Sequence, residues 1–574
     1  MQEQSKLFRI AIIGGGPTGL LTFKRFLAYG ANKNLAVDVF ERKQILGAGM
    51  PYSRDGALDE HITNVSGNEI PEFERSVEEW VQTEDQDTLN RFKIDPDHFN
   101  DYKVLPRLLF GRYLSDQFKS LIKQARSEKI EVNVRYGSEV VDIIDDPKNG
   151  ITTVIEGKGE KFQFDRVIIC SGHHWPEKLE GKIKNYYDSP YPPTKLAHRT
   201  NHEVAIRGSS LTAIDALRTL SRNNGKFKKN ENGELIYSLD KDSPHFKMVM
   251  HSKNGFLPAV RFHLEDSHLS KGSVLSHEEV AKIRAENDGF MPLNYVYKRN
   301  FLEPLAKADP EFHREIASLS IEEFVDKMMG MRENRNAFNL LEEEYKEAEK
   351  SIKKRESIDW KEMLAVLSFA MNYPAKHFSA EDMQRLKKTL MPLISVVIAF
   401  APQASVEEML ALHQAGVLDI VSVGEDSKIE PREEGGIVYS YYDESDHKVS
   451  KVYNTFVDAI GQPHLEMKDI PYPSLISEGV FTAAKLKFNS RIIAKKQVSQ
   501  GNEDVMKFND GEYYLKVPGI AINDNFQVLD AYGAANERIY MLAVPYIGGY
   551  NPDYSGLDFG EAASEKIVSA IFNA

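Results

Sequence analysis

The feature that most constrains this chain is a glycine-rich turn close to its N-terminus. Residues 8–13 form a short apolar run of the kind that a buried parallel strand requires. They lead into Gly14-Gly-Gly16-Pro-Thr-Gly19, which has the spacing G-x-G-x-x-G, and apolar residues with helical spacing follow it. In this motif the first glycine permits a tight turn, the second lets the backbone approach a pyrophosphate, and the third lets the helix pack close to the strand.

A second strand-like run supports the same interpretation. The run covers residues 36–40 and is followed directly by Glu41. Glu41 lies about 20 residues beyond the turn, where such domains carry the carboxylate that binds ribose hydroxyls. The helix that starts at the turn would offer backbone N–H groups and the positive end of its dipole to phosphates. The sequence therefore predicts a dinucleotide-binding βαβ unit. Its predicted contacts are Gly14, Gly16, Pro17, Thr18, Gly19, Glu41 and Arg42.

Composition narrows the class of protein. The chain has 574 residues, enough for several domains. Its 72 Lys and Arg residues against 86 Asp and Glu residues leave a net charge of −14, which argues against nucleic acid and against an anionic membrane as the main partner. Residues 1–6 are polar, without a secretory signal, and no apolar stretch reaches the ~20 residues that cross a bilayer. We therefore expect a cytoplasmic protein.

The single cysteine limits the chemistry further. Cys170 alone cannot form an intramolecular disulfide, a C-x-x-C dithiol pair or a cysteine-rich metal site. Because it lies inside a strand-like run, we interpret it as a small apolar filler rather than a reactive thiol. The sequence also lacks an H-E-x-x-H motif and any metal-ligand spacing, so we expect no metal site.

A second, degenerate nucleotide loop is predicted further along the chain. The strand-like residues 203–207 precede Gly208-Ser-Ser210-Leu-Thr-Ala213, in which serine and alanine replace the second and third glycines of the motif. The next strand-like run ends at His251-Ser-Lys253 without the acid that an NAD site usually carries. A lysine there can meet a 2′-phosphate, so NADPH is favoured over NADH. The predicted contacts are Gly208, Ser209, Ser210, Thr212 and Lys253.

Two alternatives stay open for this second loop. The gap between its two strands is long, so residues 222–243 would have to form a surface excursion. The domain could also keep the dinucleotide-binding fold and bind no nucleotide, because the motif is degenerate.

Three later segments resemble those of flavoproteins with two dinucleotide-binding domains. They are the strand-like runs 165–172, 456–461 and 538–544, the last of which precedes a loop with Gly548 and Gly549 and a final helix. In that family the N-terminal motif holds FAD, strands like the first two mark the crossings between domains, and the final segment closes over the flavin. The resemblance implies an α/β fold with two Rossmann-like domains and FAD contacts at Ser171, Gly172, Gly461, Tyr546, Gly548 and Gly549.

Four blocks narrow the resemblance to a bacterial group of FAD-NAD(P)-binding proteins. The blocks are 47–53 (GAGMPYS), 61–65 (HITNV), 105–113 (LPRLLFGRY) and 208–215 (GSSLTAID). By this resemblance the flavin lies beside Met50, Tyr52, His61, Asn64 and Val65. Arg107 and Arg112 could serve the pyrophosphate, or they could be ordinary surface charges.

The middle of the chain predicts long amphipathic helices. They cover residues 321–331, 338–352, 360–369 and 380–390, after which Pro392 would end the last helix and residues 393–400 would form a buried strand. A strand over 417–423 and a hairpin over 436–451 are predicted next. The helical block could cap a substrate cleft, make a homodimer contact, or serve only as a packing element.

These observations set the expected domain boundaries. The expected parts are 1–197 and 456–574 for the FAD domain, 198–267 and 392–455 for the NAD(P)-like domain, and 268–391 for the helical insertion.

The chemistry is predicted from the cofactors and one further resemblance. Residues 171–176 (SGHHWP) resemble the linker of flavin-containing and N-hydroxylating monooxygenases, although the F-x-G-x-x-x-H-[FW] motif of those enzymes is not met. His61, His173 and His174 are candidate catalytic residues, or else exposed histidines without a catalytic role. We expect an FAD-dependent NAD(P)H oxidoreductase, in its most specific form a single-component monooxygenase acting on a small molecule. The alternatives are electron transfer to a quinone or another acceptor, and a non-catalytic flavin-bound sensor.

Overall fold

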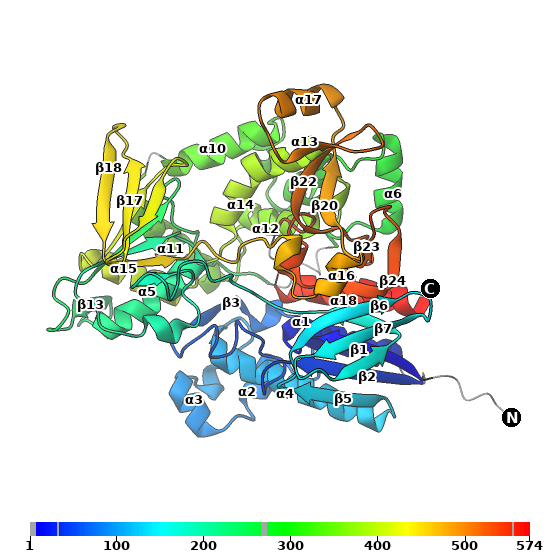
Figure 1. Cartoon of the computed structure of the whole chain (residues 1–574). Coiled ribbons are helices and arrows are strands. Elements are labelled where there is room, and N and C mark those ends of the chain that lie inside the picture. Colours follow the sequence, from blue (N-terminus) through cyan, green and yellow to red (C-terminus); the bar gives the residue numbers. More distant parts are fainter. Residues whose placement is uncertain (1–6, 31–33, 266–271, 334, 554–555, 574) are drawn as a thin grey trace.

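The computed structural model describes residues 7–30, 34–265, 272–333, 335–553 and 556–573. Two mainly parallel sheets stand side by side, with a block of helices packed against both (Figure 1). This arrangement confirms the predicted α/β fold with two Rossmann-like domains and a helical middle region.

The first sheet has six strands in the order β23-β24-β9-β1-β2-β5. Its central strands are parallel and β23 is an antiparallel edge strand. Apolar side chains of β1 and β2 are buried on both faces, which explains why these strands read as continuous apolar runs. The strands are β1 (Phe8–Ile13), β2 (Leu35–Glu41), β5 (Glu131–Tyr136), β9 (Arg166–Ile169), β23 (Gln527–Leu529) and β24 (Ala535–Met541).

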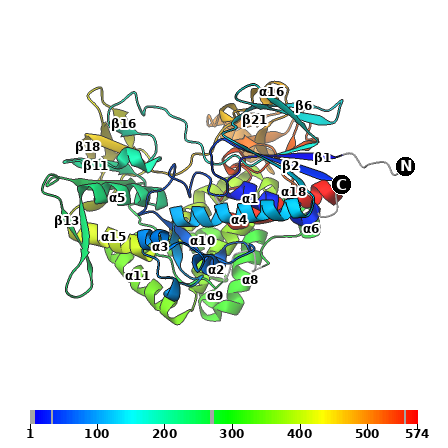
Figure 2. The same ribbon diagram turned by 90° about the horizontal axis from the view of Figure 1, so that it is seen from below.

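Three helices cover this sheet: α1 (Pro17–Gly30), α4 (Arg107–Ser127) and α18 (Leu557–Asn573). Helices α1 and α18 lie side by side (Figure 2). A Cβ on Gly560, near the start of α18, would lie 3.0 Å from Leu21 and 3.9 Å from Thr18, near the start of α1. At the other end of both helices the Tyr29 and Phe572 rings stack with their centroids 6.4 Å apart. The two helices are therefore parallel, and both N-termini lie at the carboxyl edge of the sheet.

Smaller elements complete the first domain. They are β3 (Ile62–Ser66) paired with β4 (Val104–Pro106), the antiparallel sheet β6 (Val140–Asp146), β7 (Ile151–Glu156) and β8 (Lys161–Phe164), the helices α2 (Val77–Val81) and α3 (Gln86–Phe92), and near the C-terminus α16 (Pro473–Ser477), α17 (Arg491–Ser499) and the sheet β20 (Ala483–Lys487), β22 (Tyr513–Ile520) and β21 (Val505–Lys507).

The second sheet is fully parallel, in the order β10-β19-β11-β14-β15. Helices α5 (Leu211–Asn224) and α15 (Gln403–Gln414) contribute to its apolar core. A hairpin of β12 (Gly225–Lys229) and β13 (Leu235–Leu239) follows α5 and confirms the excursion predicted over 222–243. The sheet strands are β10 (Tyr186–Tyr187), β11 (Glu203–Arg207), β14 (Lys247–Ser252), β15 (Leu418–Ser422) and β19 (Thr455–Asp458).

Strand pairing moves two of the expected domain boundaries. β10 lies within 1–197 and β19 falls almost entirely within 456–574, both of which were expected to belong to the first domain. Both strands instead pair in the second sheet, because β19 lies between β10 and β11. The expected boundary at residue 268 lies outside the described residues.

The helical insertion connects β14 to β15. Its side chains enter the core of the first domain through Phe301 and Leu364, and the core of the second through Phe338 and Leu341. It comprises α6 (His277–Glu286), α7 (Leu293–Tyr297), a π-helix (Lys298–Leu302), α8 (Glu303–Ala308), α9 (Pro310–Ile316), α10 (Ile321–Glu333), α11 (Ala337–Lys354), α12 (Asp359–Met371), α13 (Ala380–Arg385), a second π-helix (Leu386–Leu390) and α14 (Met391–Val397).

The predicted strand over 393–400 is wrong, because the helix continues through this segment as α14. Pro392 occupies the first turn of α14, where a residue without an N–H is tolerated, and the preceding π-helix supplies the change of pitch. The apolar run was compatible with either a buried strand or a buried helix.

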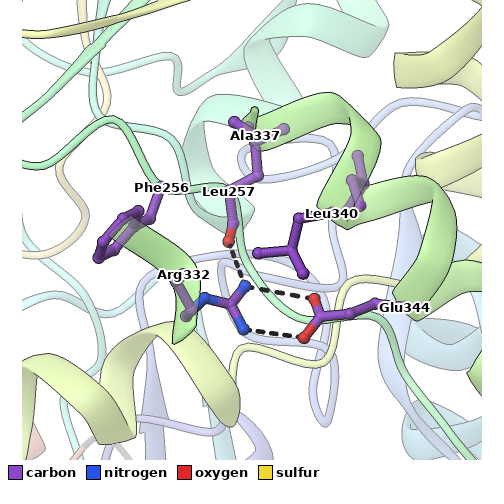
Figure 3. Close-up of a pocket in the computed structure, with 7 residues that line it drawn as sticks. Phe256, Leu257, Arg332, Ala337, Leu340 and Glu344 are labelled. Carbon is purple, nitrogen blue, oxygen red and sulfur yellow. Dashed lines mark hydrogen bonds and ion pairs between the residues drawn. The ribbon is translucent and has the colours of Figure 1, made fainter. Parts of the chain in front are cut away.

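A buried ion pair joins α10 to α11 within the insertion (Figure 3). The Arg332 guanidinium donates to both carboxylate oxygens of Glu344, at 2.8 and 3.2 Å, and to the carbonyl oxygen of Leu257 at 3.2 Å. The adjoining cavity has a volume of about 10 Å³, room for no more than one water molecule. This pair therefore fastens the insertion to the second domain and is not a ligand site.

The hairpin predicted over 436–451 is confirmed as β17 (Ile437–Tyr442) and β18 (Lys448–Tyr453), with β16 (Lys428–Pro431) beside β17. It covers His251 of β14, which is 1% exposed. The His251 ring stacks on Tyr439 at 4.4 Å, and its Nε2 lies 3.1 Å from the Tyr453 hydroxyl. Burial lowers the pKa of His251 to about 4.

Two features are absent from the described residues. No helix among them has the length and apolar character needed to cross a membrane. They also contain no group of three or more His, Cys, Asp or Glu side chains able to hold a metal ion. Residues 1–6, on which the expectation of no secretory signal depends, lie outside the described part of the chain.

The His251 site predicts a pH-dependent stability. In the unfolded chain a histidine titrates near pH 6.5, so between about pH 6.5 and 4 the unfolded state binds a proton that the folded state does not. The free energy of unfolding should fall as the pH drops through this window, by up to about 3 kcal/mol from this group. We expect His251→Phe to reduce that fall, measured by chemical denaturation at several pH values. His245→Phe, at an exposed histidine, should leave the pH dependence unaltered. If the fall in His251→Phe were as large as in the unchanged protein, that result would contradict the assignment.

Candidate nucleotide-binding sites

The first glycine loop joins β1 to α1 at the carboxyl edge of the first sheet. Gly14 has φ +105°, and a Cβ there would lie 2.7 Å from the carbonyl oxygen of Cys170. A Cβ at Gly16 would lie 3.2 Å from the Cα of Gly49, and one at Gly19 would collide with the carbonyl oxygen of Gly14. The loop is therefore packed backbone to backbone, and it presents the first turn of α1, with Pro17 and Thr18, to a ligand.

Glu41 lies beside this loop at the end of β2. Its carboxylate accepts the Gly15 N–H at 2.9 Å and the Lys43 N–H at 2.8 Å, and the residue is 9% exposed. Two backbone donors hold the carboxylate in one orientation and leave acceptor capacity for ribose hydroxyls. Arg42, the next residue, is exposed.

Residues that follow β9 complete this edge. Ser171 is half-buried and Gly172 is exposed, with nothing within 4 Å of a Cβ placed on Gly172. His173 stacks on Trp175 with ring centroids 5.4 Å apart, and burial lowers its pKa. Its Nδ1 is buried and has no hydrogen-bond partner among the described residues. The backbone cradle, the fixed carboxylate and this unpartnered nitrogen together fit a bound dinucleotide.

His174, the neighbouring candidate, has an exposed side chain. Its backbone N–H donates to Gln462 at 2.9 Å, and its carbonyl oxygen accepts from the same amide at 2.6 Å. The contacts of His174 are therefore made by its backbone.

Cys170 is 5% exposed, and burial raises its pKa to about 12. Its sulfur lies 3.6 Å from the Thr22 hydroxyl. This environment supports its interpretation as an inert filler.

Gly548 and Gly549 of the closing segment were expected to contact FAD, but each lies against another part of the protein. A Cβ at Gly548 would collide with the ring of His464, and one at Gly549 would collide with the carbonyl oxygen of Pro518. These glycines are explained by protein packing alone. Tyr546 is buried, with its hydroxyl 3.5 Å from the carbonyl oxygen of Asp469.

The residues expected beside the flavin lie in two places, the segment before β3 and β3 itself. Met50 and Tyr52 are half-buried; the Tyr52 ring meets Phe110 edge-on at 4.9 Å. Asn64 and Val65 are half-buried on β3, where the Asn64 carbonyl accepts from Arg261 of the second domain. β3 is therefore an interdomain strand.

Three predicted site residues have other partners. Arg107 was expected to serve the pyrophosphate, but its guanidinium pairs with Asp215 of α5 at 2.5 Å and donates to the Ile62 carbonyl at 3.0 Å. His61, a candidate catalytic residue, is fully buried, and both of its ring nitrogens contact protein groups. Both belong to the contact between the domains. Arg112 donates to Thr88 at 2.7 Å and pairs with Glu84 at 2.8 Å, so it fastens α4 to α3.

The second loop joins β11 to α5 in the same way as the first. Gly208 has φ +110°, and a Cβ there would lie 2.6 Å from the carbonyl oxygen of Ala459. The Ser209 hydroxyl donates to the Phe256 carbonyl at 2.7 Å. Ser210 is exposed at the N-cap of α5 and makes no side-chain cap hydrogen bond, so its hydroxyl is available to a phosphate.

Gly461 belongs to this second loop rather than to the FAD site where it was expected. A Cβ on Gly461 would lie 3.8 Å from the Thr212 hydroxyl in the first turn of α5. The physical reason is that β19 pairs with β11, so the residues after β19 reach the second carboxyl edge.

The end of β14 supplies the remaining groups of this loop. Lys253 is 73% exposed and lies 3.4 Å from Glu425. The Ser252 hydroxyl is buried without a hydrogen-bond partner in the described part of the chain. Arg207, at the end of β11, pairs with Asp458 at 3.2 Å.

Comparison with known families agrees with this geometry. Residues 11–174 match the family model described as FAD-NAD(P)-binding. Residues 276–398 match the model of the YdhS-like middle domain, which coincides with the helical insertion. The resemblance inferred from the sequence is thereby confirmed.

Three individual proteins are similar to this chain. The Escherichia coli (strain K12) protein YdhS is 29% identical over 473 residues, covering 81% of this chain and 85% of its own. Dimethylaniline monooxygenase [N-oxide-forming] 2 of Cavia porcellus is 21% identical over 260 residues, covering 43% and 44%. The structure of ornithine hydroxylase from Pseudomonas aeruginosa overlays with a TM-score of 0.45 at 11% identity, covering 99% of both chains.

Sequence reasoning gave no role to several residues that the structure brings together. Asp215, Tyr191, Arg261 and Glu69 are charged or polar groups at the contact between domains. The sequence contains one indication that Asp215 is buried, because this acid lies beside the apolar positions Ile214 and Leu217 of a helix. Such a residue is buried only with a partner.

The Glu41 geometry yields a prediction about affinity. Glu41→Gln keeps the size of the side chain but places an amide NH₂ where one carboxylate oxygen accepts a backbone N–H. The ribose hydroxyls of FAD would then lose a charged, correctly oriented acceptor, which costs about 1.5–3 kcal/mol, so we expect FAD to bind about 10- to 100-fold more weakly. Fluorescence titration with FAD measures this. Glu131→Gln, an exposed change on the neighbouring β5, is the control, and equal affinities in both variants would refute the role of Glu41.

Proposed function

We propose that this protein is an FAD-dependent oxidoreductase that takes electrons from NADPH, with FAD at the first loop and NADPH at the second. The observation that carries the proposal is the pair of glycine turns at the carboxyl edges of two parallel sheets, Gly14 to Gly19 and Gly208 to Ala213. Open α/β sheets bind ligands at that edge. The proposal assigns FAD to the first loop because β24 and α18 return to that sheet and bring a second helix N-terminus to it.

The chain's own groups then have definite tasks. Glu41 holds the ribose of FAD, and the first turn of α1 faces its pyrophosphate. Ser210 donates to the phosphates of NADPH, and Lys253 meets the 2′-phosphate. The buried contact between the domains excludes water from the space between the two nucleotides. FAD, when bound, accepts hydride from NADPH and passes the electrons on.

In its most specific form the proposal is a monooxygenase with oxygen and a small molecule as substrates. Partial similarity to dimethylaniline monooxygenase supports this form. We assign to His173 the task of holding a proton beside the flavin, because its half-buried ring is held against Trp175 and its Nδ1 has no hydrogen-bond partner among the described residues. Its depressed pKa keeps it neutral at pH 7, so its ring can both donate and accept a hydrogen bond.

Anaerobic mixing with NADPH tests the proposal. The FAD-loaded protein should lose its visible flavin absorbance, because hydride transfer reduces the ring. Admitting oxygen should restore the absorbance, and a monooxygenase would yield an oxygenated product with a suitable small molecule. Absorbance that persists with both NADPH and NADH would reject the oxidoreductase and favour a sensor.

The same assay tests the coenzyme assignment. Lys253→Glu should raise the NADPH concentration needed for half-maximal reduction by about tenfold or more and leave that for NADH nearly unchanged, because NADPH alone carries the 2′-phosphate. Lys247→Glu, at the opposite end of β14, is the matched control. Equal effects of Lys253→Glu on the two coenzymes would reject the NADPH assignment.

A further inference from the structure

The two nucleotide-binding domains meet through a carboxylate buried between them. Asp215 of α5 accepts from the Arg107 guanidinium of the first domain and from the Tyr191 hydroxyl, both at 2.5 Å. The side chains of Arg107 and Asp215 are 15% and 6% exposed. The Arg107 backbone N–H also donates to the carbonyl oxygen of His61 at 2.9 Å. The ion pair is therefore shielded from water and from screening by salt.

His61 binds the same turn of α5 through its ring. The Leu58 backbone N–H donates to His61 Nδ1 at 2.8 Å, so the proton of the neutral ring is on Nε2. Nε2 lies 3.1 Å from the backbone carbonyl oxygen of Asp215 and donates to it. One helical turn further along α5, the Thr219 hydroxyl donates to Glu60 at 2.9 Å. His61 is thus a structural contact to α5.

A second buried ion pair holds the other end of β3. Arg261, in the segment after β14, pairs with Glu69 and donates to the Ser66 hydroxyl at 2.9 Å. The Asn68 side-chain amide donates to the carbonyl oxygen of Leu264 at 2.9 Å. β3 therefore lies between two contacts from the second domain, and Figure 1 shows it between α5 and α1.

The position of Asp215 connects this interface to the second nucleotide loop. Helix α5 starts at Leu211, directly after Gly208 to Ser210, and Asp215 lies in its second turn. A helix is rigid over one turn, so whatever fixes Asp215 also fixes the loop. Arg107 is in turn the first residue of α4, and its guanidinium donates to the Ile62 carbonyl at 3.0 Å. The pair thus joins the start of α5 to the start of α4.

We propose that Asp215 is a positioning residue, whose bonds to Arg107 and Tyr191 hold the second nucleotide in one fixed orientation toward the first. This inference rests on the proposed function for its effect on hydride transfer, but its structural part concerns the chain alone. Hydride transfer requires reacting atoms about 3–3.5 Å apart, and a displacement of about 1 Å can cost about 100-fold in rate. Contacts within each loop set the affinity for the nucleotides, whereas Asp215 sets the distance between them.

Asp215→Asn tests this inference. The amide keeps the shape but leaves the Arg107 charge unpaired in a buried place, so the contact should loosen. At saturating NADPH the limiting rate of anaerobic flavin reduction should fall about 10- to 100-fold. The dissociation constants of FAD and NADPH should stay within about twofold, because Asp215 contacts neither loop in the described structure.

Backbone amide hydrogen exchange tests the structural part of the inference without any coenzyme. In Asp215→Asn the backbone amides of residues 58–66 and 211–219 should exchange at least about tenfold faster, while those of the first sheet stay protected. Arg107→Lys, which keeps the charge and loses the bond to Ile62, should give intermediate values in both measurements. Asp145→Asn is the matched control, because Asp145 belongs to a buried ion pair with Arg538 inside the first domain, away from the interface.

The outcomes separate this inference from the proposed function. Faster exchange at the interface together with a lowered limiting rate, both absent in Asp145→Asn, supports the inference. Unchanged exchange at residues 58–66 and 211–219, or a rate loss equal to that of Asp145→Asn, overturns it. A wild-type protein that is never reduced by NADPH or NADH contradicts the proposed function, and hydrogen exchange then still decides whether Asp215 holds the domains together.

Discussion

The close approach of two backbones at the first glycine loop is the constraint on which the rest of the structure depends. The Gly14 Cα faces the carbonyl oxygen of Cys170 so closely that any side chain would collide with it. This contact lies where β1 and β9, which pair with each other, both end, and it leaves no room for a side chain at the first position of the loop that precedes α1. A phosphate can then reach backbone N–H groups, with Glu41 placed for a sugar. The same packing recurs at Gly208 against Ala459.

The chain contains two such loops, one in each domain, so the position of one loop relative to the other has to be fixed. Two nucleotide loops are useful for electron transfer only if they face each other at a fixed distance. Under the proposed function, the interface around β3 meets this need with two buried ion pairs, Arg107–Asp215 and Arg261–Glu69, and with the neutral His61. Burying charges has a large desolvation cost, so these pairs contribute a defined orientation more than they contribute stability. The insertion, which enters both cores, adds to the same rigidity.

The fold was predictable from the sequence wherever the signal was local. The glycine turn, the strand leading to Glu41, the hairpin over 436–451 and the long helices of the insertion each follow from spacing within a short window. What sequence reasoning missed depends on partners far along the chain. Arg107 looked like a phosphate ligand because its partner, Asp215, is 108 residues away. Gly461 was assigned to the wrong loop because only strand pairing shows which sheet β19 joins. The apolar run 393–400 fits a strand or a helix equally, and only the packing of α14 decides between them.

The central claim is that FAD occupies the first loop, and the cofactor content of the purified protein tests it most directly. Protein purified without added flavin, or after saturation with FAD and removal of the excess, should be yellow. On denaturation it should release one FAD per chain, identified by its spectrum and mass. A protein that stays colourless after incubation with FAD, and that fails to quench flavin fluorescence in a titration, would contradict the account.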